Sequence, residues 1–187
     1  MIETEKKYRL SKEVFDKLGE VFKTMFYREC SEENILYTGN NLKASEVLRT
    51  RKVSDVWGYR DFVVTYKGKA TTNKGIKSRT EIEFKTRERT VLEFIQCLGY
   101  LPTLVYEKKR KDFFQEKTIV SLDELPFGYY MEIEGSAEHI GRIEDMLRDR
   151  FLIELNTEHL SYPDLTQLYG KLINGVVEAR FLPLTTP

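Results

Sequence analysis

Polar and apolar residues alternate along several short stretches of this chain, and a period of two residues is typical of β-strands. In three of these stretches, Glu3–Lys7, Arg79–Glu83 and Glu132–Glu134, charged residues stand two positions apart. Successive strand side chains point to opposite faces, so these charges share one face and the residues between them share the other. Several strands with one charged face predict a fold with a polar interior.

The same alternation along the whole chain predicts eight strands, and a helical spacing of apolar residues predicts four helices. The strands are expected at residues 1–9, 34–38, 47–54, 59–67, 77–84, 104–114, 118–123 and 129–135. The helices are expected after Ser11, over 90–98, over 136–151 and from Pro163 to about Val177. Residues 69–75 are expected to form a polar loop, and the tail 182–187 is expected to be frayed.

Short connections between the strands favour antiparallel pairing, and closing the sheet removes its exposed edges. The expected fold is therefore α+β: a closed eight-stranded antiparallel β-barrel, forming a tunnel with a charged interior, with helices packed outside. The apolar strand residues opposite the charges are expected to face these helices. They are Val64, Tyr66, Ile82, Phe84, Met131 and Ile133.

Composition narrows the classes of function. The length of 187 residues suits one domain, residues 1–187. Lys plus Arg and Asp plus Glu number 30 each, and a net charge of zero argues against nucleic acid or a membrane as partner. Cys30 and Cys97 lack metal-ligand spacing and are interpreted as free thiols in a reducing cytoplasm. The sequence has no long apolar run and no signal-peptide pattern, which also predicts a cytoplasmic location.

The charged faces carry two sets of residues with complementary chemistry. Carboxylates suit hard divalent cations such as Mg²⁺ or Mn²⁺, whereas guanidinium and ammonium groups suit phosphate oxygens. The expected metal ligands are Glu3, Glu5, Glu81, Glu83, Asp123, Glu132 and Glu134. The expected phosphate-binding residues are Lys7, Arg49, Arg51, Lys67, Arg79, Lys85, Lys108 and Arg110. Both sets in one cavity predict a site for a metal ion and a polyphosphate.

A charged strand face also has an ordinary explanation, because many antiparallel sheets have one solvated face with cross-strand ion pairs. That explanation is adequate for any one of these strands. Repetition of the pattern over six strands favours the interior site.

The charged motifs, in their order along the chain, resemble those of the CYTH family, also called triphosphate tunnel metalloenzymes, which includes class IV adenylate cyclases and thiamine triphosphatases. The motifs are Glu3–Lys7, Leu48–Lys52, Thr65–Gly68, Arg79–Glu83, Lys108–Arg110, Leu122–Glu124 and Phe127–Glu134. The match covers residues 1 to about 170, but residues 34–38 lack the Tyr-x-Asp-Thr of many members. Ser161-Tyr162 with Leu165 resembles an element of the cyclase-like branch, or is simply the start of a helix packed on the barrel.

The resemblance implies a substrate with a linear triphosphate and a pair of Mg²⁺ or Mn²⁺ ions. It implies that the metal is bound by Glu3 and Glu5 with Glu132 and Glu134, and that these residues and Lys7 carry catalysis. The eight basic residues named above would hold the phosphates. Family members are often dimers, so a homodimer is also implied.

Three functions remain open. The favoured one is hydrolysis of tripolyphosphate or of a nucleoside or thiamine triphosphate. The second is cyclisation of ATP to cyclic AMP and pyrophosphate in the same tunnel. The third is a non-catalytic binder of polyphosphate or a nucleotide, which the paired glutamates disfavour because a pure anion site gains nothing from carboxylates.

Overall fold

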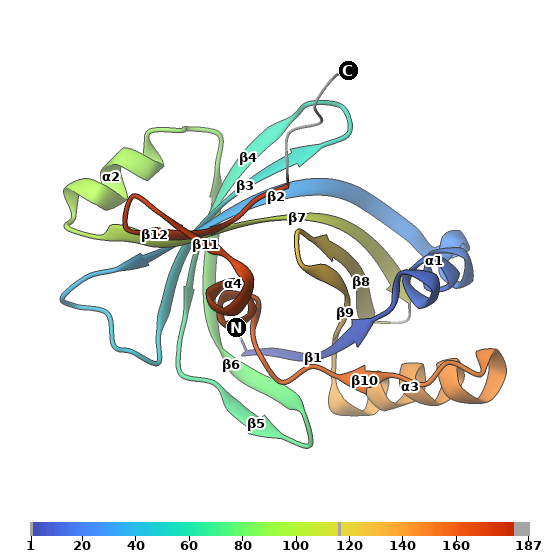
Figure 1. The fold of residues 1–187 in the computed structure, drawn as a ribbon. Coiled ribbons are helices and arrows are strands. Elements are labelled where there is room, and N and C mark those ends of the chain that lie inside the picture. Colours follow the sequence, from blue (N-terminus) through green and yellow to red (C-terminus); the bar gives the residue numbers. More distant parts are fainter. Residues whose placement is uncertain (1, 116, 182–187) are drawn as a thin grey trace.

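Eight strands close into an antiparallel barrel in this structure, a computed structural model that describes residues 2–115 and 117–181 (Figure 1). Around the ring the strands are β1 (Ile2–Leu10), β9 (Gly128–Glu134), β8 (Thr118–Leu125), β7 (Leu101–Gln115), β2 (Phe26–Thr38), β3 (Val47–Asp55), β4 (Arg60–Lys67) and β6 (Ile76–Thr86). Pairing of β6 with β1, from Ile2 opposite Thr80 to Glu5 opposite Lys77, completes the ring. The predicted closed barrel is confirmed, and the tail expected to fray lies outside the described residues.

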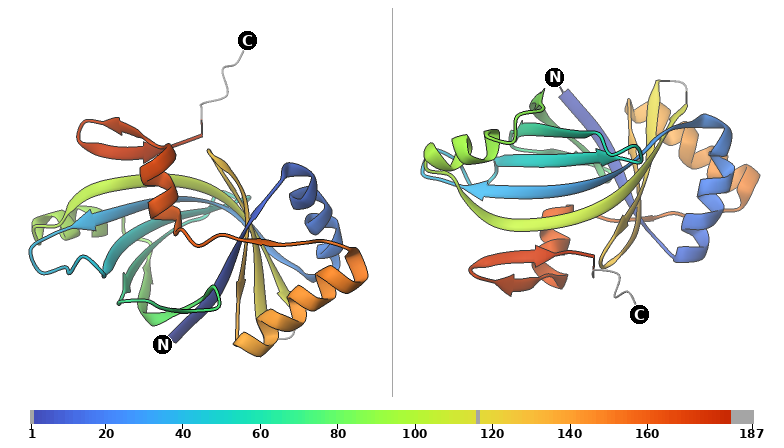
Figure 2. Two further views of the ribbon diagram at one scale, coloured as in Figure 1. Left: turned by 60° about the horizontal axis from the view of Figure 1, so that its bottom comes forward. Right: turned by 90° about the horizontal axis from the view of Figure 1, so that it is seen from above.

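Two helices cover the outside of β1, β8 and β9. They are α1 (Lys12–Val21) and α3 (Ala137–Phe151), which lie on the same side of the barrel (Figure 2). Each helix begins where the sequence predicts, because the hydroxyls of Ser11 and Ser136 accept hydrogen bonds from the backbone of the first turn. Beneath them Met131 and Ile133 are fully buried in the largest apolar cluster, as predicted.

The third helix, α2 (Val91–Cys97), lies on the opposite side of the barrel and leaves β6 uncovered. Its Ile95 packs against Val64 and Tyr37 of the outer barrel face. Ile82 and Phe84 are 61% and 55% exposed, so the prediction that they face a helix is wrong. A helix of seven residues is too short to cover β6 as well as β2, β3 and β4.

Two further predictions are wrong: where the last helix ends and where the second strand begins. The last helix, α4 (Tyr162–Tyr169), is capped by Gly170, and a hairpin follows in place of the helical turns that were predicted up to about Val177. Its strands are β11 (Lys171–Ile173) and β12 (Val176–Ala179), joined by Asn174 and Gly175 with φ of 50° and 82°. Positive φ at both positions is the geometry of a type I′ hairpin turn, for which Asn-Gly is a preferred pair.

Strand β2 begins at Phe26, eight residues before the predicted start at Asn34. Polar residues stand on both faces of this stretch, so the apolar alternation that marks a half-buried strand is missing. Hydrogen bonding to β3 on one side and β7 on the other holds it in the barrel. Short elements complete the fold: η1 (Lys23–Met25), β5 (Thr71–Asn73) within the predicted loop, and β10 (Asn156–Thr157) beside β1.

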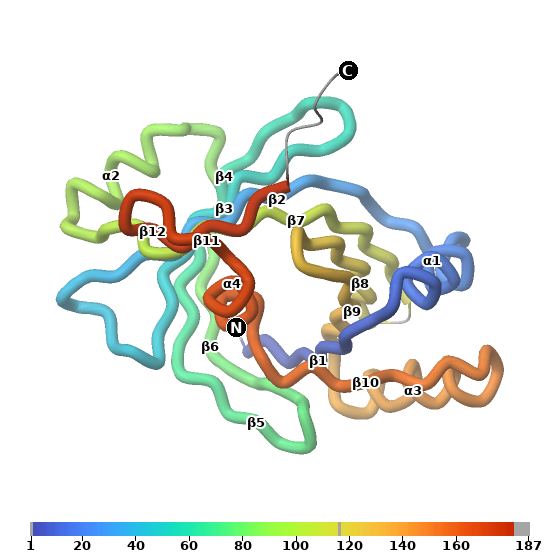
Figure 3. The backbone as a smooth tube through the Cα atoms, viewed as in Figure 1, coloured from blue at the N-terminus to red at the C-terminus, as the bar shows by residue number. Residues whose placement is uncertain are grey.

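The two ends of the barrel differ. Helix α4 lies across one end (Figure 3), where Ser161–Asp164 line the cavity. At the other end the pairing of β6 with β1 stops at Thr80, and the edge from Glu81 to Thr86 has no strand partner on that side among the described residues. We call these the helix end and the slit end. No helix in the described part of the chain is long and apolar enough to cross a membrane.

Candidate functional site

A charged tunnel runs through the barrel. Two adjoining cavities of about 300 and 560 Å³ share the lining residues Glu3, Arg51, Lys67, Arg110, Ser121 and Glu134. The smaller one reaches the helix end, where its own lining includes Glu5, Lys7, Arg49, Arg79, Lys108 and Glu132. The larger one reaches the slit end, where its own lining includes Arg28, Glu81, Glu83 and Asp112. The shared residues place the two cavities next to each other along the inside of the barrel.

All predicted site residues except Lys85 line this tunnel or lie directly behind its wall. The period of two residues explains this, since each strand of a barrel directs alternate side chains inward. Asp123 lies behind the wall and is fully buried. Lys85 is exposed and lines neither cavity, because β6 has passed the slit end at that residue.

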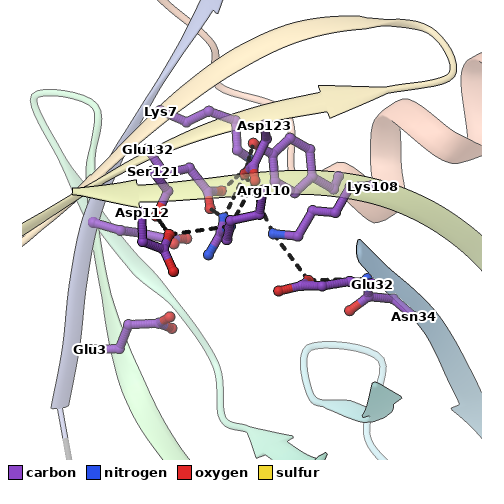
Figure 4. A network of polar contacts seen from close by, with 12 residues as sticks. Glu3, Lys7, Glu32, Asn34, Lys108, Arg110, Asp112, Ser121, Asp123 and Glu132 are labelled. Atoms are coloured by element: carbon purple, nitrogen blue, oxygen red, sulfur yellow. Dashed lines mark hydrogen bonds and ion pairs between the residues drawn. The ribbon is translucent and has the colours of Figure 1, made fainter. Parts of the chain in front are cut away.

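Arg110 joins two of the predicted carboxylates. Its Nε and Nη2 donate to Asp123 at 2.7 and 2.5 Å, and Nη2 also donates to Glu132 at 2.5 Å (Figure 4). Burial opposes the ionised form of Glu132, but the charges of Lys7, 3.5 Å away, and of Arg110 outweigh it and hold the pKa of Glu132 below its usual range. This part of the tunnel is already neutralised by its own residues.

Glu32 is a site residue that the sequence prediction missed. Its carboxylate is buried 3.2 Å from the Nε of Arg51 and 3.4 Å from the Nζ of Lys108. Asn34 bridges the same group, since its Oδ1 accepts from Arg51 Nε at 3.1 Å. Burial raises the pKa of Glu32, but the charge of Arg51 and then that of Lys108 overcome this effect and lower it. Glu32 and Asn34 stand two positions apart, which would indicate one strand face, but the polar residues between and before them hide this period in the sequence.

The opposite wall, formed by β1 and β6, is less completely neutralised. Lys67 Nζ lies 2.9 Å from Glu3 and 2.7 Å from Glu81, and Arg79 Nε lies 3.1 Å from Glu3. Burial opposes ionisation of Glu3, but a hydrogen bond with Glu81 and the charge of Lys67 lower its pKa to about 2. Burial and the same hydrogen bond raise the pKa of Glu81 to about 7.

Two further carboxylates crowd this region. Glu5 and Glu134 stand opposite each other on β1 and β9. The pKa of Glu5 is raised by burial and then by the charges of Glu132 and Glu3. The pKa of Glu134 is raised by burial and then by Glu3 and Glu5. Carboxylates that raise one another's pKa are short of positive charge, and a divalent cation would supply it.

The donor set of this carboxylate group fits a hard divalent ion. Oxygen ligands from acidic residues are those preferred by Mg²⁺ and Mn²⁺. Among the described residues, however, no three Asp, Glu, His or Cys side chains are already gathered as a metal-binding group. Metal binding therefore stays a prediction, and it requires the side chains of Glu3, Glu5 and Glu134 to converge on the ion.

Tyr162, the first residue of α4, reaches into the tunnel wall. Its hydroxyl donates to Asp123 Oδ2 at 2.7 Å, and its ring lies 3.9 Å from the Nζ of Lys7. The oxygens of Asp123 thus accept from Tyr162 and from Arg110, with Lys108 at 3.4 Å. These contacts give Asp123 a positioning role, while its predicted metal ligation stays untested. The sequence prediction did not assign Tyr162 to the site, because its contact with Asp123 joins α4 to the distant strand β8.

Two cations at the helix end have no carboxylate partner. Buried Arg49 donates from Nη2 to Thr65 Oγ1 at 3.3 Å, while its Nε has no hydrogen-bond partner. Lys77, also missed by the sequence prediction, lies opposite Glu5, and its side chain forms no ion pair or hydrogen bond with the described residues. Burial and then the charges of Lys7 and Arg79 lower the pKa of Lys77. An anion at this end would give both cations a partner.

Comparisons with known proteins support this assignment of the fold. A family model of the CYTH domain matches residues 1–163. The PH1819 protein of Pyrococcus horikoshii is 29% identical, with a TM-score of 0.76 over 89% of this chain and 98% of that chain. No curated protein sequence matches the chain significantly.

Two more distant structures have names that mention an activity. A Hippeastrum protein, classed as a candidate adenylyl cyclase and described as having a dominant triphosphatase activity, is 17% identical, with a TM-score of 0.67 over 86% of this chain and 92% of that chain. A Vibrio parahaemolyticus protein provisionally named an adenylate cyclase is 18% identical, with a TM-score of 0.65 over 89% and 98%. At these identities the likeness shows the fold alone.

Proposed function

The chain belongs to the CYTH family, and we propose that it is a divalent-metal-dependent enzyme that binds a linear triphosphate in its tunnel and hydrolyses it. One observation carries the proposal. Carboxylates crowded enough to raise one another's pKa line the same tunnel as a group of buried cations, in which Arg49 has no carboxylate partner. The first group calls for a cation and the second for an anion, and a metal–triphosphate complex supplies both.

The residues suited to hold the metal are Glu3, Glu5, Glu132 and Glu134, with room in the donor set for two ions. A bound divalent ion would supply Lewis-acid polarisation of a phosphate oxygen and a more acidic water.

The basic residues would hold and neutralise the triphosphate. Arg49 and Arg51 on β3, Lys67 on the neighbouring strand β4, Lys108 on β7 and Lys7 on β1 all face the tunnel. Several of them pair with tunnel carboxylates, as Lys67 does with Glu3, and these pairs would separate when phosphate oxygens and metal take over both partners. Phosphoryl transfer is catalysed mainly by positioning and charge neutralisation, and this arrangement supports the proposed hydrolysis on both counts.

Support from relatives is limited to the Hippeastrum protein and its described triphosphatase activity, at an identity that concerns the fold. Cyclisation of ATP would use the same tunnel with a ribose hydroxyl in place of water as the attacking group. No contact among the described residues favours cyclisation over hydrolysis, and the two reactions are distinguished by their products.

The test is an incubation of the purified protein with tripolyphosphate, ATP or thiamine triphosphate, each with Mg²⁺, with Mn²⁺ or with a chelator. We expect metal-dependent release of orthophosphate. Cyclic AMP with an equal amount of pyrophosphate would instead identify a cyclase. Binding without turnover of any substrate would identify a non-catalytic binder.

A matched pair of variants connects activity to the tunnel. Glu132→Gln keeps the shape of the side chain and removes its charge, and we expect it to abolish turnover while the fold is retained. Glu138→Gln makes the same change on the exposed face of α3, where Glu138 pairs with Arg142, and serves as the control. Unchanged turnover in Glu132→Gln would contradict the proposed site.

A further inference from the structure

The two ends of the tunnel differ in how far they are covered. At the helix end α4 lies over the opening, and Tyr162 is only 5% exposed with its hydroxyl bonded to Asp123. At the slit end the unpaired edge of β6 leaves an opening toward β8 and β9, and the cavity there measures about 560 Å³ against about 300 Å³. The slit end is therefore the less covered end and has the larger cavity.

The two ends also differ in charge. Lys7, Arg49, Arg79 and Lys108 line the helix end alone. The slit end has one base of its own, Arg28, which is bound to Asp112 at 2.6 Å, and it also has Glu81 and Glu83. Arg49, which has no carboxylate partner, lines the helix end, and Lys77, which also has none, lies on β6 opposite Glu5, another residue that lines this end alone. The attraction for phosphate is therefore strongest at the covered end.

The slit end also has an apolar part, formed by three isoleucines. Ile2, Ile82 and Ile119 line it, and Ile2 and Ile82 are 74% and 61% exposed. Ile82 is one of the residues that no helix covers, so its exposed side chain has no packing role in the barrel. Isoleucine side chains around an opening offer apolar contacts to an organic group.

We propose that the tunnel binds its triphosphate in one direction, with the terminal phosphate beside Arg49 and Lys77 at the helix end and the organic group at the isoleucine rim of the slit end. This inference rests on the proposed function. A terminal phosphate group carries up to two charges, more than a bridging one, so it takes the place where cations are unpaired. Contacts at the slit end would then determine which organic group is bound. Tripolyphosphate has no organic group, so its affinity would not depend on those contacts.

The reverse orientation has its own structural basis. Leu36, Ala44 and Val47 are apolar and line the helix end. A nucleoside bound there would place the terminal phosphate toward the slit end, and the test must separate these two orientations.

The test compares a bulky substitution at each end, Ile82→Trp and Ala44→Trp. Calorimetry with Ca²⁺ in place of Mg²⁺ gives the dissociation constants for tripolyphosphate and for the β,γ-imido analogue of ATP. We expect the ratio of the two constants to change at least fivefold in Ile82→Trp, through blocking or stacking, and to stay within twofold in Ala44→Trp. The opposite pattern, or an unchanged ratio in both variants, would overturn the proposed direction. Failure of the unaltered protein to bind tripolyphosphate would overturn the proposed function itself.

A second pair of variants tests the terminal-phosphate site. Lys77→Met removes the unpaired cation, and Lys69→Met removes an exposed lysine between β4 and β5 as the control. Because both ligands end in a terminal phosphate, we expect Lys77→Met to weaken both at least fivefold and by the same factor. A loss below twofold, or one confined to the ATP analogue, would contradict a terminal phosphate at Lys77.

Discussion

Two regions of the tunnel contain the same residue types but differ in how their charges are satisfied. In the paired region (Glu32, Asp123 and Glu132 with Arg51, Lys108 and Arg110), every carboxylate contacts at least one base, and the pKa values of Glu32 and Glu132 are lowered. In the crowded region (Glu3, Glu5, Glu81 and Glu134), the pKa values of three carboxylates are raised. We infer that the ion pairs of the paired region stabilise the barrel, whereas the carboxylates of the crowded region repel one another and a bound divalent cation would reduce that repulsion.

The largest expected effect is loss of stability in the paired region. Arg110→Met leaves the buried carboxylate of Asp123 without its bidentate partner and that of Glu132 without one hydrogen bond, and breaking such a buried pair costs about 3–5 kcal/mol. Urea denaturation measures the free energy of unfolding. Arg148→Met, which removes an exposed ion pair on α3, is the control and should cost less than about 1 kcal/mol. A cost below about 1 kcal/mol for Arg110→Met would remove the distinction between the regions.

The crowded region should show the opposite behaviour. Glu5→Gln removes a charge that Glu132 and Glu3 repel, so thermal stability should be unchanged or higher. Turnover of tripolyphosphate should nevertheless fall by about 100-fold, on the order of 3 kcal/mol in the activation barrier, because a proposed metal ligand is lost. The melting temperature and kcat are measured on the same preparation. Parallel loss of both would place Glu5 with the structural residues instead.

The pH dependence of stability provides a third comparison. Because the pKa of Glu32 is lowered on folding, its contribution to stability is present above the pKa of an unfolded glutamate, about 4.3, and is lost as pH falls through the lower folded value. Glu32→Gln should therefore lower the free energy of unfolding near pH 7 by on the order of 1–3 kcal/mol, and the difference from the unaltered protein, measured by urea denaturation, should shrink toward pH 3. A difference that is constant over this range would refute the assigned charge interaction.

The smallest expected effect concerns the contact between α4 and the paired region. Tyr162→Phe removes the hydroxyl that donates to Asp123 and keeps the ring beside Lys7. Because Arg110 and Lys108 remain beside Asp123, loss of this one hydrogen bond should cost only about 1 kcal/mol. Tyr169→Phe, at the exposed end of the same helix, is the matched control. Equal melting temperatures for the two variants would show that the bond to Asp123 contributes nothing.

Period-two alternation predicted most of the barrel and the tunnel, because it fixes which side chains face inward whatever the strand's neighbours are. It failed where apolar residues do not alternate with the polar ones. Residues 26–33 carry polar side chains on both faces, so Glu32 escaped notice.

Other failures have different physical causes. Leu168, Leu172 and Ile173 fit a helical spacing, yet Asn174-Gly175 favours a tight turn and a hairpin forms. Ile82 and Phe84 show the apolar alternation of a covered face, although the distribution of helices around a barrel is not a local property. The contact of Tyr162 with Asp123 joins residues 39 positions apart, and no pattern within one element indicates it.

The unpaired edge of β6 bears on how the protein avoids aggregation. A free strand edge can pair with the strand of a neighbouring molecule and so begin a continuous intermolecular sheet. Along the free edge, Glu81, Glu83 and Lys85 place charges at every second position. Charged side chains on an edge make such pairing unfavourable. Charged side chains at the slit end would therefore also keep this open edge of the barrel from pairing with another molecule.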